Sequence, residues 1–392
     1  MKKKKILMVH NFYQIGGGEH TVFRNEVELL RENGHEVVEY TRSNDELKTS
    51  KLKLFLMPFT TTWSWKTYWE VQAIIKKEKI DIVHCHNTFP LISPSVYYAA
   101  CNLKIPVVQT IHNFRLLCPN GAFFCDGKIC EECTSENRLS PAIKKNCYRG
   151  SKVQTLVLTT MLVVHRWLGT YRKINYIFLT DFNRKKFSKL IDIDSPKVFV
   201  KPNFVSSSFE GQERKEISTT FVYASRLEEN KGLKYLVHQW KKLSEDYILH
   251  IYGDGPLKEY LINEIKDSNN ISYLGFKPQS VIFEDLRKSM AMVFPSMWYE
   301  GFPMIIAESM AIGCPILSAD IGNHGDIVRA ANCGALFSFN DDESFSRALH
   351  EVIKNNNVFS LNCDRYYRNV LEKQKNYQQL NEIYQLIGRQ DE

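Results

Sequence analysis

Two glutamates eight residues apart, Glu300 and Glu308, are the strongest candidates for chemistry in this sequence. They lie in the segment Trp298-Tyr299-Glu300-Gly301-Phe302-Pro303-Met304-Ile305-Ile306-Ala307-Glu308, between an apolar run at 291–294 and a helical run. Eight residues is slightly more than two helical turns, so both carboxylates are expected on much the same side of the helix. The free N–H groups at that helix start suit phosphate, and the carboxylates suit sugar hydroxyls. The alternative is a strand–loop–helix unit with two solvated glutamates.

A second candidate is the loop Ser225-Arg226-Leu227-Glu228-Glu229-Asn230-Lys231-Gly232. Arg226 ends a predicted strand and Lys231 begins a predicted helix, so the two cations can hold a diphosphate. Arg226 would bind it through two N–H groups and Lys231 as a point charge. The alternative is a solvated turn in which these charges pair with Glu228 and Glu229.

Three further loops at predicted strand ends are candidates for donor binding. In the first, Gly16, Gly17 and Gly18 would let backbone N–H groups approach a phosphate at a helix start, although the G-x-G-x-x-G dinucleotide spacing is absent. The second contains Gly253 and Gly255, and the third contains Leu274 and Phe276. All three could also be ordinary turns.

Short β-rich runs alternate with amphipathic helical runs along the chain, which indicates an α/β fold with parallel sheets covered on both faces. The pattern restarts after a Pro- and Ser-containing break at 202–208, so two Rossmann-like domains are expected. The expected strands are 5–10, 36–41, 81–85, 107–111, 176–179 and 197–201, then 219–224, 247–252, 271–274, 291–294, 315–318 and 334–337. The expected helices are 19–32, 68–79, 94–102, 152–173 and 182–190, then 232–242, 257–266, 281–288, 342–353 and 365–386.

Composition excludes several classes of protein. The 392 residues are too many for one core, and apolar and charged fractions of 44% and 24% are ordinary for a soluble globular protein. A net charge of +7 favours anionic ligands or an anionic membrane surface, and no nucleic-acid-binding motif is present. The N-terminal apolar run is too short for a signal peptide, and the run 156–164 is too short for a membrane span. We expect a cytoplasmic protein that touches a membrane only at its surface.

The order of these motifs over the second half resembles glycosyltransferase family 4, whose paired-glutamate and R-L-x-x-x-K-G patterns match Glu300, Glu308 and 226–232. The resemblance implies the GT-B fold, with two doubly wound parallel-sheet domains facing a central cleft. Residues 1–203 would form the acceptor-side domain, 204–364 the donor domain, and 365–392 a helix crossing back to the first domain.

The resemblance also implies a retaining transfer from a nucleotide sugar, with no metal or cofactor in catalysis. Glu300 would hold donor sugar hydroxyls, Glu308 the ribose, and Arg226 and Lys231 the leaving diphosphate. His112 stands where relatives carry an active-site histidine. The backbone of Gly301, Phe302, Pro303 and Met304 would face the sugar. The D-x-D run at 192–194 does not follow a strand, so we reject it as a metal-dependent donor site.

Cysteines cluster at Cys118, Cys125, Cys130, Cys133 and Cys147. Cys130 and Cys133 have the C-x-x-C spacing of a zinc half-site, which Cys118 and Cys147 could complete, with Cys125 as a competitor. Disulfides are not expected in a cytosolic chain. The segment at about 113–151 resembles an insert in some bacterial family members, and a structural zinc would staple it. The alternative is unmetallated thiols.

The acceptor is specified only in class. Segments 51–59 and 63–66 mix lysines with aromatic residues, and the apolar helix 152–173 ends in basic residues, which suits an anionic membrane and a lipid-linked acceptor or, alternatively, core packing. We therefore expect a hexosyltransferase that uses a UDP- or GDP-sugar and a glycan or polyprenyl-linked acceptor, in capsule or O-antigen synthesis. The alternatives are a catalytically silent membrane-surface module and an epimerase- or phosphorylase-like GT-B enzyme.

Overall fold

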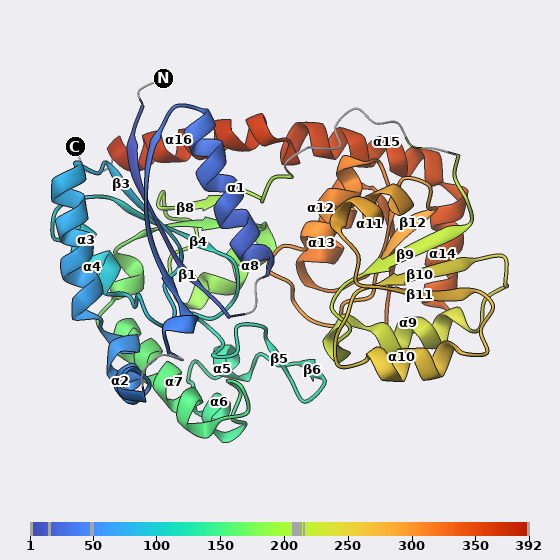
Figure 1. The fold of residues 1–392 in the computed structure, drawn as a ribbon, viewed down its shortest axis with the longest axis horizontal. Coiled ribbons are helices and arrows are strands. Elements are labelled where there is room, and N and C mark those ends of the chain that lie inside the picture. Colours follow the sequence, from blue (N-terminus) through green and yellow to red (C-terminus); the bar gives the residue numbers. More distant parts are fainter. Residues whose placement is uncertain (1–2, 15–16, 48–50, 206–213, 215, 390–392) are drawn as a thin grey trace. The chain divides into compact units, whose positions relative to one another are not determined.

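The computed structural model describes residues 3–14, 17–47, 51–205, 214 and 216–389, without the side chains of 51–55 and 389. The chain forms two compact units. The first unit comprises Met1–Phe123, Glu131–Asn203 and Asn376–Glu392, and the second comprises Phe124–Cys130 and Phe204–Lys375. Each unit is an α/β layer structure built on its own parallel sheet (Figure 1).

The sheet of the first unit has the order β2-β1-β3-β4-β7-β8, and all its paired strands are parallel. The order reverses between β1 and β3, so loops leaving these two strands turn to opposite sides. The strands are β1 (Lys5–Phe12), β2 (Glu36–Ser43), β3 (Ile82–Asn87), β4 (Val107–Ile111), β7 (Asn175–Phe178) and β8 (Val198–Val200).

Helices cover this sheet because its central strands are buried along almost their whole length. The helices are α1 (Gly18–Glu32), α2 (Lys51–Thr62), α3 (Trp65–Glu78), α4 (Ser95–Cys101), α5 (Glu132–Ser135), α6 (Ser140–Lys144), α7 (Lys152–Trp167), α8 (Asp181–Lys186) and α16 (Lys373–Arg389). In one core cluster, Ile6 and Met8 of β1 group with Phe23 of α1 and with Leu380 and Tyr384 of α16. The last helix is therefore part of the first unit's core.

The sheet of the second unit has the order β11-β10-β9-β12-β13-β14, again with all paired strands parallel. Here the order reverses between β9 and β12. The strands are β9 (Thr220–Ala224), β10 (Ile248–Tyr252), β11 (Ile271–Gly275), β12 (Ala291–Phe294), β13 (Ile316–Ala319) and β14 (Gly334–Phe337).

Two hydrophobic clusters flank this second sheet. Phe221 and Tyr223 belong to one cluster and Val222, between them in β9, belongs to the other, as the alternation of side chains along a strand requires. The helices that cover the sheet are α9 (Leu233–Trp240), α10 (Lys258–Ile265), α11 (Gln279–Leu286), α12 (Met304–Ala311), α13 (Gly322–Ala331), α14 (Ser344–Lys354) and α15 (Asn356–Tyr366).

Each strand expected from the sequence is present, with ends shifted by at most a few residues. Two helix predictions are wrong. The run 152–173 ends as a helix at Trp167, because Gly169 adopts a left-handed conformation with φ 62°. The single helix expected at 365–386 is instead α15, a π-helical turn at Tyr367–Leu371 and α16, because the backbone is extended at Glu372, with ψ 143°.

The division into units also differs from the expected boundaries in two places. The units divide at Asn203/Phe204, but the second unit runs to Lys375 rather than to 364. The short hairpin formed by β5 (Phe124–Cys125) and β6 (Lys128–Ile129), expected inside the first domain's insert, groups with the second unit. Among the described residues, no helix is both long and apolar enough to cross a bilayer.

Candidate active site

The loops after β9 and β12 meet at the point where the strand order of the second unit reverses. Such a point is where open parallel sheets bind ligands. The Met297 backbone N–H donates to the Asn230 carbonyl oxygen at 2.9 Å, which ties the two loops together. Gly232 has φ +73°, and a Cβ there would lie 1.8 Å from the Pro295 carbonyl oxygen. Only glycine fits this approach, so Gly232 allows the Lys231 loop to rest against the Glu300 loop.

Glu300 is the centre of this site. Its Oε1 accepts hydrogen bonds from Lys231 Nζ at 2.7 Å, Ser296 Oγ at 2.7 Å and Trp298 Nε1 at 2.6 Å. Burial would raise the pKa of this carboxyl, but the Lys231 charge and these bonds outweigh burial and hold the pKa below its ordinary value. Glu300 is therefore a fixed carboxylate, and all three of these hydrogen bonds end on Oε1 rather than on Oε2.

The expected helical spacing of the two glutamates is wrong. Helix α12 begins at Met304, so Glu300 lies in the loop before it, with Gly301, Phe302 and Pro303. The Asn323 side chain donates to the backbone oxygens of Glu300 and Gly301, which fixes this loop. Glu300 is held by its own hydrogen bonds rather than by helix geometry.

The two cations expected to hold a diphosphate, Lys231 and Arg226, each pair with a different glutamate. Lys231 contacts Glu300, and its Nζ also lies 4.9 Å from the centre of the Trp298 ring. Arg226 instead pairs with Glu228 at 2.7 Å, with 59% of its side chain exposed. This is the charge pairing that the sequence offered as the alternative for Arg226.

Glu308 lies on α12, where Gln279 Nε2 donates to its Oε1 at 2.7 Å. Burial raises the pKa of Glu308 to about 7, although the bond from Gln279 acts in the opposite direction. The environments of the two glutamates therefore differ: Glu300 is paired with a cation and ionised, whereas Glu308 has a neutral partner and titrates near neutral pH.

The remaining donor-loop predictions lie at the carboxyl edge of the same sheet. Gly253 and Gly255 have φ +133° and +156°, and a Cβ at Gly253 would lie 1.9 Å from the Ser225 carbonyl oxygen. The glycine loop thus packs closely on the Arg226 loop. Leu274 is half-buried in β11, and Phe276, just after this strand, is 77% exposed.

His324 is a residue that the sequence did not single out. It is buried in α13, and its ring nitrogens make no hydrogen bond of good geometry with the described residues, although the ring lies near the Ser296 backbone. Burial lowers its pKa to about 4, and the charge of Glu300 opposes this shift, so the imidazole is neutral beside the carboxylate. The run Gly322-Asn323-His324-Gly325 resembles a turn in the sequence, which hid the helix that carries this histidine.

In the first unit, His112 follows β4 and belongs to a chain of hydrogen bonds. His112 Nε2 lies 2.9 Å from His86 Nδ1, and His86 Nε2 lies 3.3 Å from Glu26 Oε1. Burial lowers the pKa of His112 well below its ordinary value, so this ring is neutral. In the neutral form of His86, the N–H donates to Glu26, so His112 Nε2–H must donate to His86. His112 Nδ1 is then left as a hydrogen-bond acceptor.

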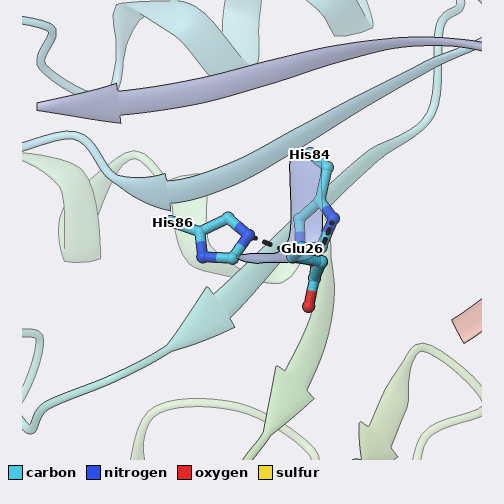
Figure 2. Close-up of side chains that lie close together, drawn as sticks. All are labelled: Glu26, His84 and His86. Atoms are coloured by element: carbon cyan, nitrogen blue, oxygen red, sulfur yellow. Dashed lines mark hydrogen bonds and ion pairs between the residues drawn. The ribbon is translucent and has the colours of Figure 1, made fainter. Parts of the chain in front are cut away.

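Glu26, His84 and His86 are the one group of His, Cys, Asp or Glu side chains in the described part of the chain whose ligand atoms lie within 4.8 Å of one another (Figure 2). A cation already occupies this group, because Lys201 Nζ lies 3.2 Å from Glu26 Oε2. His84 uses Nδ1 with Tyr384 Oη and Nε2 with Thr110 Oγ1, both at 2.7 Å. Burial would raise the pKa of Glu26, but Lys201 and the histidines hold it well below its ordinary value. The group is therefore a buried ion-pair network rather than a metal site.

The glycine loop and the cysteine cluster are described in part. Gly16 lies outside the described residues, Gly17 precedes α1 in an extended conformation, and Gly18 begins the helix. Cys118 and Cys133 are buried, whereas Cys130 and Cys147 are half-buried. The four cysteines form no group that meets the same ligand-distance criterion among the described residues. The zinc site stays a prediction.

Comparisons with known proteins agree with this geometry. The family model described as "Glycosyl transferases group 1" matches residues 206–372, and the model "Glycosyltransferase Family 4" matches residues 15–124. The UDP-Gal:alpha-D-GlcNAc-diphosphoundecaprenol alpha-1,3-galactosyltransferase of Escherichia coli is 26% identical over 346 residues, which span 81% of this chain and 79% of the relative.

Solved structures show the same fold at low sequence identity. Sucrose-phosphate synthase from Thermosynechococcus elongatus superposes with a TM-score of 0.68 at 13% identity, covering 99% of this chain and 100% of that one. Anabaena Alr3699/HepE in complex with UDP and glucose superposes with a TM-score of 0.65 at 15% identity, covering 97% and 98%. The two family models together account for most of the chain, and each of the two units contains one parallel sheet. The chain therefore belongs to glycosyltransferase family 4 and has the GT-B fold.

Proposed function

We propose that this protein is a retaining, metal-independent hexosyltransferase that moves a sugar, galactose in the first instance, from a UDP-sugar to a glycan on a lipid diphosphate. The observation that carries the proposal is the ionised Glu300, held by Lys231 where the strand order of the second sheet reverses. The donor and acceptor classes are those in the name of the Escherichia coli galactosyltransferase, and the UDP and glucose in the HepE complex fit the same class of donor.

The chemistry follows from the charges at this site. Glu300 Oε2 would accept hydrogen bonds from donor sugar hydroxyls, while the N–H groups of Lys231 not used by Glu300 would stabilise the leaving diphosphate. The bond from the sugar C1 to the diphosphate breaks, and the acceptor oxygen bonds to C1 on the same face. The acceptor proton passes to the departing phosphate oxygen. This path retains the anomeric configuration and needs no metal, because Lys231 and Arg226 supply the positive charge.

A lipid-linked acceptor also fits the surface of the first unit. Trp65 and Trp69 flank Tyr68 on α3 and are 62% and 61% exposed, and Trp167 at the end of α7 is 85% exposed. Exposed tryptophans beside lysines suit the interface of an anionic bilayer, so we place the protein at the cytoplasmic face of the membrane. Co-sedimentation with anionic vesicles, lost in Trp167→Ser and retained in the wild type, would test this contact.

The function is tested by turnover of a panel of UDP- and GDP-sugars with a synthetic GlcNAc-diphosphate that carries a short alkyl chain. We expect UDP-galactose to be used, an α-linked product to form, and turnover to survive chelation of divalent ions. A β-linked product, or an absolute need for added Mg²⁺ or Mn²⁺, would contradict the retaining or the metal-independent part. No transfer from any nucleotide sugar would contradict the enzyme assignment.

Replacing the cation beside Glu300 should slow the chemical step. Lys231→Met removes the leaving-group contact and leaves Glu300 without its ion pair, so kcat should fall about 10²-fold or more. Arg226→Ala should lower kcat to a similar extent, because Arg226 is the second cation assigned to the diphosphate. Lys234→Met is the matched control, since Lys234 pairs with Glu229 at the surface, and it should stay within about twofold of the wild type. Near-normal kcat in both Lys231→Met and Arg226→Ala would end the diphosphate assignment.

Nucleotide affinity should depend on the ionisation of Glu308. Below its pKa of about 7 the carboxyl is protonated and is a poorer acceptor for ribose hydroxyls, so affinity should rise as the pH rises through 7. If only the ionised form binds, calorimetry should show the Kd for UDP tightening about tenfold between about pH 6 and pH 8. Glu308→Gln should lose this component, whereas titration of the UDP phosphate affects both proteins equally. Identical pH profiles in the two proteins would show that Glu308 does not contact the nucleotide.

The cysteine cluster carries a proposal that is independent of catalysis. If Cys118, Cys130, Cys133 and Cys147 bind zinc, freshly purified protein should contain about one zinc per chain, in a closed four-thiolate site. Cys130→Ser should lose the metal and make the segment 118–147 more sensitive to protease, while Cys101→Ser, in α4 outside the cluster, should retain the metal. Elemental analysis that finds no zinc in reduced wild-type protein would leave these residues as thiols.

A further inference from the structure

A second polar cluster lies beside the strand-order reversal of the first unit, on segments that follow β1, β3 and β4. Arg115 is its centre. The guanidinium carbon lies 4.8 Å from the ring centre of Phe89 and 5.7 Å from the ring centres of Tyr13 and Tyr148. Gly121, with φ +80°, closes the loop behind Arg115, and a Cβ there would lie 3.5 Å from Arg115 Nη2. The guanidinium is thus fixed in place by three aromatic rings and a tight turn.

Polar atoms of this cluster lack partners. Tyr13 Oη, Glu19 Oε1 and Arg115 Nη1 are buried and make no hydrogen bond of good geometry with any described residue, although the Tyr13 side chain lies near Asn87 and that of Arg115 near Tyr148. The other carboxylate oxygen, Glu19 Oε2, accepts only a long bond of 3.5 Å from Asn113 Nδ2. A buried polar atom without a hydrogen-bond partner destabilises the folded protein, so we infer that a ligand supplies the missing hydrogen bonds of this cluster.

Glu19 differs from Glu26 of the same helix in the partners of its carboxylate oxygens. Glu26 is also buried on α1, but both of its oxygens contact Lys201 or histidine nitrogens. Glu19 and Arg115 influence each other by charge, yet neither Glu19 Oε1 nor Arg115 Nη1 has a hydrogen bond, so these two atoms are not bonded to each other. Burial raises the pKa of Glu19 to about 7, because the charge of Arg115 only partly compensates.

The chemistry of the three atoms selects a class of ligand. A guanidinium only donates hydrogen bonds and a carboxylate only accepts them, so a group between them must do both. A hydroxyl does both, whereas an anion would be repelled by Glu19 and a cation by Arg115. The aromatic rings offer faces against which the C–H groups of a sugar can pack. A cavity of about 50 Å³ borders Phe89, Asn113, Arg115 and His112, so Arg115 shares this cavity with the histidine of the first unit.

We propose that Tyr13, Glu19 and Arg115 form the subsite that binds the hydroxyl groups of the acceptor sugar. The proposal rests on the proposed function, because it assumes a glycan acceptor. In this subsite an acceptor hydroxyl donates to Glu19 Oε1 and accepts from Arg115 Nη1, and Tyr13 Oη bonds a neighbouring hydroxyl. The ligand is a neutral sugar ring, not the diphosphate of the lipid carrier.

Steady-state kinetics with UDP-galactose and alkyl-linked GlcNAc-diphosphate test the subsite. Glu19→Gln and Arg115→Lys should each raise the acceptor KM about tenfold or more, the usual loss when a hydrogen bond to a charged group is removed, with the Kd for UDP unchanged. Tyr13→Phe, the least disruptive change, should raise the acceptor KM by a smaller factor. Glu28→Gln, an exposed change on the same helix, is the matched control and should leave both constants unchanged. An unchanged acceptor KM in Glu19→Gln and Arg115→Lys would overturn the proposal.

A binding measurement separates this proposal from the proposed function. Saturation-transfer NMR with methyl glycosides of GlcNAc, galactose and glucose needs no turnover, and at least one should bind the wild type and lose binding in Glu19→Gln. This result would support the subsite even if no transfer were found. If no methyl glycoside binds the wild type, or if binding is unchanged in both Glu19→Gln and Arg115→Lys, the proposal is wrong. An acceptor KM that rises only for the diphosphate substrate, and not for the corresponding alkyl glycoside, would assign Arg115 to phosphate and also overturn it.

Discussion

A buried carboxylate that stays ionised needs a cation beside it, and each unit of this protein contains one such pair. Glu300 pairs with Lys231 at 2.7 Å in the second unit, and Glu26 pairs with Lys201 at 3.2 Å in the first. In both cases burial alone would favour the neutral acid, and the lysine reverses that preference. The surroundings follow from this pairing. Trp298 and Ser296 supply further donors to Glu300, while Glu26 contacts His86, which in turn hydrogen-bonds His112.

The parallel sheets explain why these charged groups lie where they do. All paired strands of each main sheet are parallel, so every strand delivers its following loop to the same edge. Because the strand order reverses between β9 and β12, and between β1 and β3, the helices that follow these strands go to opposite faces of the sheet, and the loops that precede these helices form the edge where such sheets bind ligands. Glycine is needed at the closest approach, at Gly232, where a Cβ would collide with the Pro295 carbonyl oxygen. Sheet topology thus sets the position of the site, and the loop sequences set its chemistry.

The sequence predicts the strands and the loops that follow them, because these depend on residues close together in the chain. Apolar runs and turn residues locate the strands, and the chain places Arg226, Lys231 and Glu300 directly after two of them. The actual partners could not be predicted in the same way. Glu26 appears in the sequence as one more residue of an amphipathic helix, and its partner Lys201 lies 175 positions away. The break at Glu372 and the helix that carries His324 depend on tertiary packing, which overrides local propensity.

The glutamates of the two units differ in how many of their carboxylate oxygens already have a partner, and this difference distinguishes a structural carboxylate from a candidate for ligand binding. Glu26 has Lys201 on one oxygen and histidine nitrogens on the other, so both of its oxygens already have partners. Glu300 has its cation on one oxygen and leaves the other for hydroxyl groups. Glu308 and Glu19 have only amide partners, and burial raises the pKa of each to about 7. A carboxylate in that state is stabilised further by any group that donates a hydrogen bond to it, and sugars are rich in such groups. The number of carboxylate oxygens that already contact a cation or a donor therefore indicates which of these glutamates are candidates for substrate binding.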